Sequence, residues 1–240
     1  MSLGRFKLSK YVLPHDYEVF HKRRFEYILQ ILDSLNAENL NVLEVGVSNF
    51  SIEVYKKCRN LTTMDLCGRS HVVDEVLQNA PHILFDLQDL QRMQEYASPQ
   101  KYDIIIFAEV IEHLVIAPEH VMKFLHSLLS DDGKIILQTP NLTHIFNRLN
   151  MLRGVSPFDR MRPETDVGAS HGHVREYTKK ELIEICTAVN LKVLHHDYKN
   201  YFDSASSFRP PVYQIIKFLM TITGIVPSFR GGQTLLLVKD

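Results

Sequence analysis

The motif Glu-Val-Ile-Glu-His-Leu at residues 109–114 holds the side chains with the clearest capacity for chemistry. It directly follows the apolar run at residues 102–107, which predicts a buried strand. In an open parallel α/β sheet, ligands bind at the carboxyl ends of the strands. Glu109, Glu112 and His113 are therefore expected where a substrate would lie. His113 is the natural candidate for a base, because an imidazole accepts a proton at neutral pH.

Three further acids stand at the ends of predicted strands. Glu44 lies two residues before Gly46, Asp65 ends the next strand, and Asp86 follows a third. One carboxylate can accept both hydroxyls of a ribose, and glycine lets a ligand approach the backbone closely, so a nucleoside ligand is predicted. Each of the three acids has an alternative, purely structural role. Backbone N–H groups can satisfy Glu44, Asp65 can cap a helix, and Asp86 can sit in a turn.

Strand-like and helical patterns alternate along the chain, which predicts an α/β fold with a doubly wound, mostly parallel sheet and helices on both faces. Strands are expected at residues 41–45, 61–64, 82–85, 102–107, 134–138, 191–194 and 234–238. Helices are expected at residues 16–35, 51–58, 118–129 and 178–189. Thr178 and Glu181 form a capping-box pattern at the start of the last helix. A turn at residues 131–133 is expected to separate the third helix from the following strand.

The length predicts one domain over residues 1–240 with two special segments. Residues 141–177 have no periodicity and are too long for an inert loop, so a substrate lid is expected there. Residues 199–232 form a variable insertion before the last strand. Its apolar part, residues 212–226, is shorter than the roughly 20 residues that span a bilayer. It is either a helix packed on the sheet or a surface for a lipid-linked acceptor or a partner subunit, so peripheral membrane contact remains possible.

Composition narrows the class of protein. The 27 basic and 28 acidic residues give a net charge of -1, which does not favour nucleic acid as a partner. The three cysteines are odd in number and lack metal-ligand spacing, which indicates a reducing, cytoplasmic compartment. The first ten residues lack the apolar core of a signal peptide. Arginines gather in and beside the lid, as in a solvated lid or a clamp on an acidic small substrate: Arg148, Arg153, Arg160, Arg162 and Arg175.

The motifs together resemble those of class I S-adenosylmethionine-dependent methyltransferases over residues 40–195. Residues 42–46 (Val-Leu-Glu-Val-Gly) resemble the first motif, and residues 61–65 and 85–87 resemble the elements that hold ribose and adenine. Residues 107–113 resemble the fourth motif of the small-molecule branch, which includes quinone-biosynthesis O-methyltransferases. Residues 138–141 and 173–178 also resemble segments of that branch. Ser48 and Phe50 stand where the family has its second and third glycines.

The resemblance implies a seven-stranded Rossmann-like fold and transfer of a methyl group from S-adenosylmethionine, leaving S-adenosylhomocysteine. The acceptor would be an oxygen of a small-molecule, sugar or lipid-linked compound. His113 would be the base, and Glu112 would orient it. The cofactor would contact Glu44, Gly46, Val47, Ser48, Asp65, Leu66, Asp86, Leu87, Ala108 and Glu109. The acceptor would contact His173, Arg175 and Tyr177, with Asn141 and His144 as weaker candidates, and no metal ligand is assigned.

Two alternatives use the same residues differently. On a helix, Glu109, Glu112 and His113 would share one face, and His171 or His173 could complete a divalent-metal site. That pattern resembles the small-RNA 3′-terminal 2′-O-methyltransferases, although Leu114 replaces their second histidine. In the other alternative, the altered glycine loop no longer binds the cofactor, and the protein is a non-catalytic, methyltransferase-like binding protein.

Overall fold

The computed structural model describes residues 17–66, 78–93, 100–158, 173–201, 214, 221 and 224–240. Cys67, Arg160, Arg162, His171 and most of the apolar segment 212–226 lie outside the described residues. Cys58 and Cys186 are buried. Among the described residues, no helix combines the length and the apolar character needed to cross a bilayer.

Seven strands form one sheet in the order β3-β2-β1-β4-β5-β7-β6. The strands are β1 (Asn41–Val45), β2 (Asn60–Asp65), β3 (His82–Leu84), β4 (Tyr102–Ala108), β5 (Leu129–Pro140), β6 (Leu191–Lys199) and β7 (Gly232–Lys239). The pairs from β3 to β5 are parallel, whereas β7 runs antiparallel to both β5 and β6. The predicted fold class, a seven-stranded, mostly parallel Rossmann-like sheet, is confirmed.

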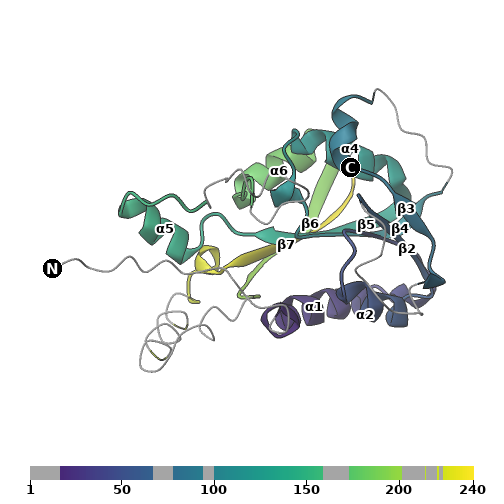
Figure 1. Cartoon of the computed structure of the whole chain (residues 1–240), viewed down its shortest axis with the longest axis horizontal. Coiled ribbons are helices and arrows are strands. Elements are labelled where there is room, and N and C mark those ends of the chain that lie inside the picture. Colours follow the sequence, from purple (N-terminus) through teal and green to yellow (C-terminus); the bar gives the residue numbers. More distant parts are fainter. Residues whose placement is uncertain are drawn as a thin grey trace.

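Helices cover both faces of the sheet (Figure 1). The α-helices are α1 (Tyr17–Ser34), α2 (Phe50–Lys57), α4 (Pro118–Leu128), α5 (Ile145–Leu152) and α6 (Lys179–Thr187). Short 3-10 helices are η1 (Ala37–Asn39), η3 (Leu87–Gln91), η4 (Ile111–His113) and η6 (Pro227–Phe229). In Figure 1, α1 and α2 lie on one side of the sheet, and α4 and α6 lie on the other.

The apolar run of β4 alternates between these two layers. Ile104 and Ile106 belong to the core that contains Ile28 of α1, whereas Ile105 and Phe107 belong to the core of α4 and α6. All four side chains are at most 1% exposed. A strand that buries both faces has no polar position to alternate with, which explains why its sequence reads as continuously apolar.

The structure differs from the predicted local structure at three places. No turn at residues 131–133 precedes β5, because β5 already starts at Leu129. Leu129 pairs with Tyr102 and Lys134 pairs with Ile104, so the extra residues form an irregularity within the strand. The predicted irregular lid contains an ordered helix, α5. The strand predicted at residues 191–194 continues to Lys199, because β7 pairs with it along its whole length.

The capping box at the start of α6 is confirmed. The Thr178 hydroxyl accepts from the Glu181 N–H at 3.2 Å, and the Glu181 carboxylate accepts from the Thr178 N–H at 2.8 Å. Two backbone donors that the helix cannot satisfy by itself thus have partners. This cap fixes the helix start directly after Tyr177, a predicted acceptor residue.

We expect Thr178→Ala to lower the free energy of unfolding by about 1 kcal/mol, because the cap is lost. Thr178→Ser keeps the hydroxyl and is the matched control, expected to retain most of the stability. Urea denaturation followed by circular dichroism measures both. Equal destabilisation by alanine and serine would contradict the role of the hydroxyl.

Candidate functional site

The loop after β1 is shaped by Gly46. Its φ of 88° lies in the left-handed region, and an added Cβ would come 2.8 Å from Val110 Cγ2. The Gly46 N–H donates to the Met64 carbonyl of the neighbouring strand at 2.9 Å. Only glycine accommodates both the backbone angle and the close approach of the loop after β4.

Asp65 ties this loop to the end of β2. Its Oδ2 accepts from the Val47 N–H at 2.9 Å, and its Oδ1 accepts from the Leu66 N–H at 2.6 Å. A carboxylate oxygen accepts more than one hydrogen bond, so holding the loop does not by itself exclude hydroxyl donors from a ligand. The helix-capping role considered for Asp65 falls on residues 67–77, outside the described part of the chain.

Glu44 is a buried acid beside the same loop. It is 3% exposed, and its Oε2 has no hydrogen-bond partner among the described residues. Burial raises the pKa of Glu44 to about 8, although a hydrogen bond from Ser51 and the charge of Arg24 act in the opposite direction. A buried acceptor without a partner marks a place where a polar ligand group or water fits.

Arg24 of α1 is a residue that the sequence analysis missed. It is 4% exposed, and its Nη1 lies 3.4 Å from Oε2 of Glu109. Arg24, Ile28 and Leu32 follow one another at four-residue intervals, and all three are buried. Arg24 could have been recognised from the sequence, because it is a charged residue on the apolar stripe of an amphipathic helix.

The ion pair with Arg24 also corrects the expected placement of Glu109. Glu109 does not share a helical face with Glu112 and His113, because its φ is 56° and η4 begins only at Ile111. Its N–H donates to the Gln138 carbonyl at 2.8 Å, which holds this left-handed turn in place. Glu109 consequently lies with Arg24 on the side of β1, where the cofactor residues were predicted.

The two positions without glycine are accommodated by local contacts. The Ser48 hydroxyl accepts from the Phe50 N–H at 3.2 Å, and the Ser51 hydroxyl accepts from the Ser48 N–H at 3.1 Å. The Phe50 ring stacks on Phe25 of α1 with centroids 4.5 Å apart. Side chains of the loop and of α1 therefore order the start of α2 at the two positions where the family has glycine.

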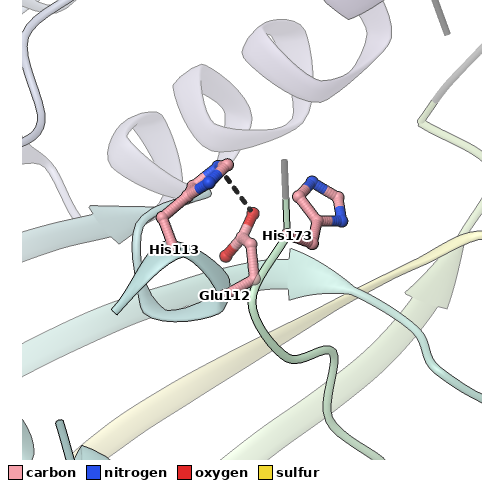
Figure 2. Close-up of side chains that lie close together, drawn as sticks. All are labelled: Glu112, His113 and His173. Atoms are coloured by element: carbon pink, nitrogen blue, oxygen red, sulfur yellow. Dashed lines mark ion pairs between the residues drawn. The ribbon is translucent and has the colours of Figure 1, made fainter. Parts of the chain in front are cut away.

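Glu112 and His113 lie next to each other at the end of β4 (Figure 2). Glu112 is completely buried, and its Oε2 accepts from the Thr139 hydroxyl at 3.0 Å. Its Oε1 has no hydrogen-bond partner among the described residues and lies 4.0 Å from His113 Nε2. His113 is partly exposed, with 28% of its side chain accessible. One end of this pair is therefore fixed in the core, and the imidazole faces the sheet edge.

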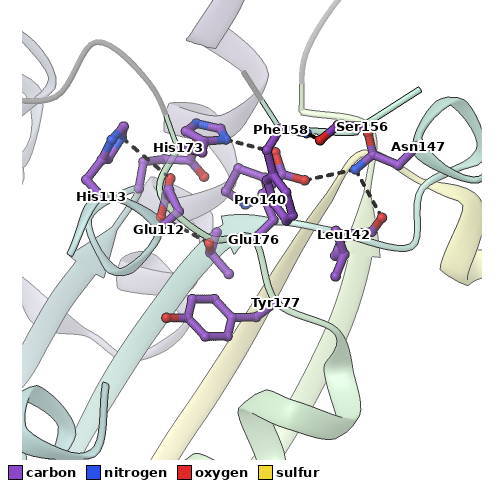
Figure 3. Close-up of polar contacts among 12 residues, drawn as sticks. Glu112, His113, Pro140, Leu142, Asn147, Ser156, Phe158, His173, Glu176 and Tyr177 are labelled. Carbon is purple, nitrogen blue, oxygen red and sulfur yellow. Dashed lines mark hydrogen bonds and ion pairs between the residues drawn. The ribbon is translucent and has the colours of Figure 1, made fainter. Parts of the chain in front are cut away.

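His173 approaches the same pair from the segment before α6. Its ring is edge-on to His113 with centroids 5.1 Å apart, and its Nδ1 lies 2.8 Å from Glu176 Oε1 (Figure 3). A carboxylate accepts hydrogen bonds, so Nδ1 of His173 is the donor in this contact, and Nε2 is the ring nitrogen that Glu176 does not hold. Oε2 of Glu176 accepts from Asn147 of α5 at 2.9 Å. A chain of contacts thus joins α5 to the two histidines.

The segment 173–176 is held against η4 by its backbone. The N–H groups of Val174 and Arg175 both donate to the Glu112 carbonyl, at 2.8 and 3.1 Å. Glu112 therefore anchors the second histidine through its main chain as well as facing His113 through its side chain. These long-range bonds explain why residues far apart in the sequence form one cluster.

The other predicted acceptor residues make mainly structural contacts. Both Asn141 amide hydrogens go to carbonyls, those of Ser228 at 2.9 Å and Arg230 at 2.8 Å. Arg175 pairs with Glu181 at 2.6 Å and is largely exposed. Tyr177 is buried, and burial raises the pKa of its phenol. A contact of any of them with an acceptor stays a prediction.

The remaining predicted cofactor residues lie at the ends of β2, β3 and β4. Asp86 caps η3 by accepting from the Gln88 N–H at 2.9 Å, which is the turn role considered for it. Leu87 and Val47 are buried, whereas Leu66 is exposed. Ala108 is the last residue of β4. His144, a weaker candidate, caps α5 by accepting from the Phe146 N–H at 3.2 Å.

Comparison with known proteins identifies the class of protein that this fold and site define. A family model described as "Methyltransferase domain" matches residues 20–196, which is more than half of the chain. The chain therefore belongs to this methyltransferase family. The predicted class, an S-adenosylmethionine-dependent methyltransferase, is confirmed, whereas membership of the quinone-biosynthesis branch is not shown. A search of curated proteins found no match.

Solved structures show the same fold at low sequence identity. The magnesium protoporphyrin IX methyltransferase from Synechocystis PCC 6803 is 15% identical with a TM-score of 0.60, covering 97% of this chain and 90% of its own. An S-adenosylmethionine-dependent methyltransferase from Clostridium acetobutylicum is 13% identical with a TM-score of 0.59, covering 95% of each chain. The N-methyltransferase NodS from Bradyrhizobium japonicum is 14% identical with a TM-score of 0.52, covering 91% and 87%.

The buried Glu44 should make stability depend on pH. Burial raises its pKa from 4.5 to about 8, so as the pH rises through this interval the unfolded chain loses the proton first and the folded state is progressively destabilised. We expect Glu44→Gln to gain stability relative to the unmodified protein between about pH 5 and pH 9. Chemical denaturation across this range measures the difference. Glu53→Gln, on the exposed side of α2, is the control, and a pH-independent difference for Glu44→Gln would contradict the prediction.

Proposed function

We propose that this methyltransferase transfers a methyl group to an oxygen of a small-molecule, sugar or lipid-linked acceptor, with His113 as the base. The observation that carries the proposal is the Glu112–His113 pair, a partly exposed imidazole beside a buried carboxylate that Thr139 fixes. An acceptor hydroxyl must lose its proton as the carbon–oxygen bond forms, and an imidazole can take it at neutral pH. The nearby carboxylate stabilises the imidazolium that results.

The residues around Gly46 fit S-adenosylmethionine, which supplies the activated methyl group when bound. Asp65 is a strand-end carboxylate beside the Gly46 loop, the kind of group that accepts ribose hydroxyls, and the left-handed φ of Gly46 shapes that loop. The unpartnered oxygen of Glu44 faces no donor among the described residues. Arg24 offers a buried cation that suits the carboxylate of the methionine moiety, in exchange with Glu109.

The surroundings of His113 favour an oxygen acceptor over a nitrogen acceptor. An amine can be methylated through its lone pair and needs a base less urgently than a hydroxyl does. A histidine base next to a carboxylate therefore favours methylation of a hydroxyl group. The main task of the remaining residues is to hold acceptor and methyl group in line and to exclude water.

Asp65→Ala is expected to abolish binding of S-adenosylhomocysteine, because the variant loses the ribose acceptor and the tie to Val47. Isothermal titration calorimetry measures this, and Asp132→Ala, on the exposed start of β5, should bind like the unmodified protein. Circular dichroism confirms that the variant is folded. If the unmodified protein itself fails to bind at millimolar ligand, the non-catalytic binding role is the better interpretation.

His113→Ala is expected to lower kcat by about 10²- to 10⁴-fold while leaving S-adenosylhomocysteine affinity unchanged, because only proton transfer is removed. Transfer of tritium from methyl-labelled S-adenosylmethionine to phenols, sugar nucleotides and lipid extracts provides the assay. His120→Ala, an exposed histidine at the start of α4, is the matched control. Full activity of His113→Ala on the acceptor found would exclude His113 as the base.

A metal-assisted reaction on the 2′-oxygen of RNA is the second candidate, and one observation favours it. Donor atoms of Glu112, His113 and His173 lie within 4.8 Å of one another. Glu176 holds Nδ1 of His173, which leaves Nε2 as a ligand atom, and carboxylate-supported histidines are typical of metal sites. The site would have three protein ligands rather than the four expected, because Glu109 pairs with Arg24.

Metal content and chelation separate the two candidates. In the metal-assisted reaction, the purified protein carries a divalent ion, EDTA abolishes activity, and Mn²⁺ or Mg²⁺ restores it. His173→Ala should then lose the bound ion. In the base reaction, activity survives EDTA and the protein is metal-free by elemental analysis.

A further inference from the structure

Most of the exposed apolar side chains of the described chain lie on two segments at one end of the molecule. Six of the eleven large apolar residues exposed among the described residues lie on two short segments, the end of α5 and the turn before η6. We call this group the apolar tip: Leu149, Met151, Leu152, Val155, Ile225 and Val226. Leu152 is 84% exposed and Ile225 is 80% exposed. Such a cluster is unusual on a protein surface facing only water.

The two segments of the apolar tip are held together by polar contacts beneath it. Asn141 donates to the Ser228 carbonyl, and the Arg148 guanidinium stacks over the Phe229 ring at 5.2 Å. After α5 the chain turns back at Gly154, whose φ is 70° and whose N–H donates to the Met151 carbonyl at 2.9 Å. Leu152 and Val155 are thus presented by an ordered turn.

The apolar tip stands at one end of the molecule. Figure 1 shows α5 and η6 next to each other, at the opposite end from the edge strand β3. Residues at an end of the long axis can touch a flat surface without interference from the sheet. This position suits a planar partner.

Within the described residues of these two segments, the charged side chains are all cationic, whereas Asp159, the next residue in the sequence, lies outside the described residues. Residues 141–158 and 224–231 contain Arg148, Arg153 and Arg230 and no aspartate or glutamate. Arg148 and Arg230 hydrogen-bond to carbonyls within the fold, whereas Arg153 is exposed beside Leu152. Exposed apolar side chains with a neighbouring cation match the interface of a bilayer that carries anionic lipids.

We propose that the apolar tip docks this protein on the surface of an anionic lipid bilayer. The apolar side chains enter the boundary between headgroups and acyl chains, and Arg153 meets lipid phosphates. A second copy of the chain fits less well, because a stable protein interface takes about 20–30 residues from each side and the apolar tip offers six. The proposal does not depend on methyl transfer.

Docking at this place would bring a lipid-linked acceptor to the site. Asn147 lies on α5 beside the apolar tip and donates to Glu176, which holds His173 next to His113 (Figure 3). The helix that touches the bilayer is thus in contact with the acceptor side of the sheet edge. This consequence alone rests on the function proposed above.

Flotation with vesicles tests the docking surface directly. The full chain is mixed with vesicles of equal phosphatidylglycerol and phosphatidylcholine, or of phosphatidylcholine alone, without S-adenosylmethionine. We expect the unmodified protein to bind the anionic vesicles and to be released by high salt. Leu152→Glu with Ile225→Glu should lower the partition coefficient at least tenfold, because two apolar side chains that enter the bilayer are lost. Arg153→Gln should lower it roughly fivefold, the effect of one cation near the surface.

Leu84→Glu with Leu194→Glu is the matched control. It adds the same charge at two exposed leucines outside the apolar tip, so binding should stay within twofold of the unmodified protein. Failure of the unmodified protein to bind anionic vesicles, or equal loss in both double variants, would overturn the proposal. So would a fall in molecular mass by light scattering for the tip variant alone, since the tip would then join two copies. Calorimetry with S-adenosylhomocysteine checks that all variants are folded.

Discussion

Parallel pairing of β1 with β2 on one side and β4 on the other brings three loops to a single edge of the sheet. Val45 pairs with both Met64 and Phe107, so the chain leaves the sheet at Gly46, Asp65 and Ala108 side by side. In this register, the Asp65 carboxylate reaches the Val47 N–H. A shift by one residue would turn every side chain of a strand to the other face. Both the cofactor side and the acceptor side of the site depend on this alignment.

The site brings together two buried acids and one partly buried acid, and few cations lie near them. Glu44, Glu109 and Glu112 each keep an oxygen without a hydrogen-bond partner among the described residues. Burial of such oxygens costs stability unless a ligand or water satisfies them. Arg24 offsets part of that cost beside Glu109, and Thr139 does so beside Glu112. The unpaired acids therefore lower the stability of the folded state at the edge of the sheet. Such a local loss is expected where a site binds polar ligand groups.

The segment after β5 links the acceptor side to the surface. Asn141 fixes the start of this segment to η6, and Asn147 fixes α5 to Glu176. The first part of the segment 141–177, predicted to be a lid, therefore contains an ordered helix, from which Asn147 contacts Glu176 and Leu149, Met151 and Leu152 contribute to the apolar tip. The helix that carries part of the apolar tip therefore also helps to position His173, through Asn147 and Glu176.

The sequence by itself determined the fold class, most of the element boundaries, the capping box of α6 and the strand-end acids. These features depend on local pattern: continuous apolar runs for strands buried on both faces, helical spacing, and residues that cap or turn. Glu109 and Arg24 show where this reasoning fails. A helical spacing places Glu109 beside His113, but the hydrogen bond to Gln138 of another strand sets a left-handed φ and turns it toward Arg24. The meeting of His113 with His173 likewise depends on bonds between residues about sixty apart. Only the tertiary structure decided these contacts, because their energy comes from partners that the chain brings together after folding.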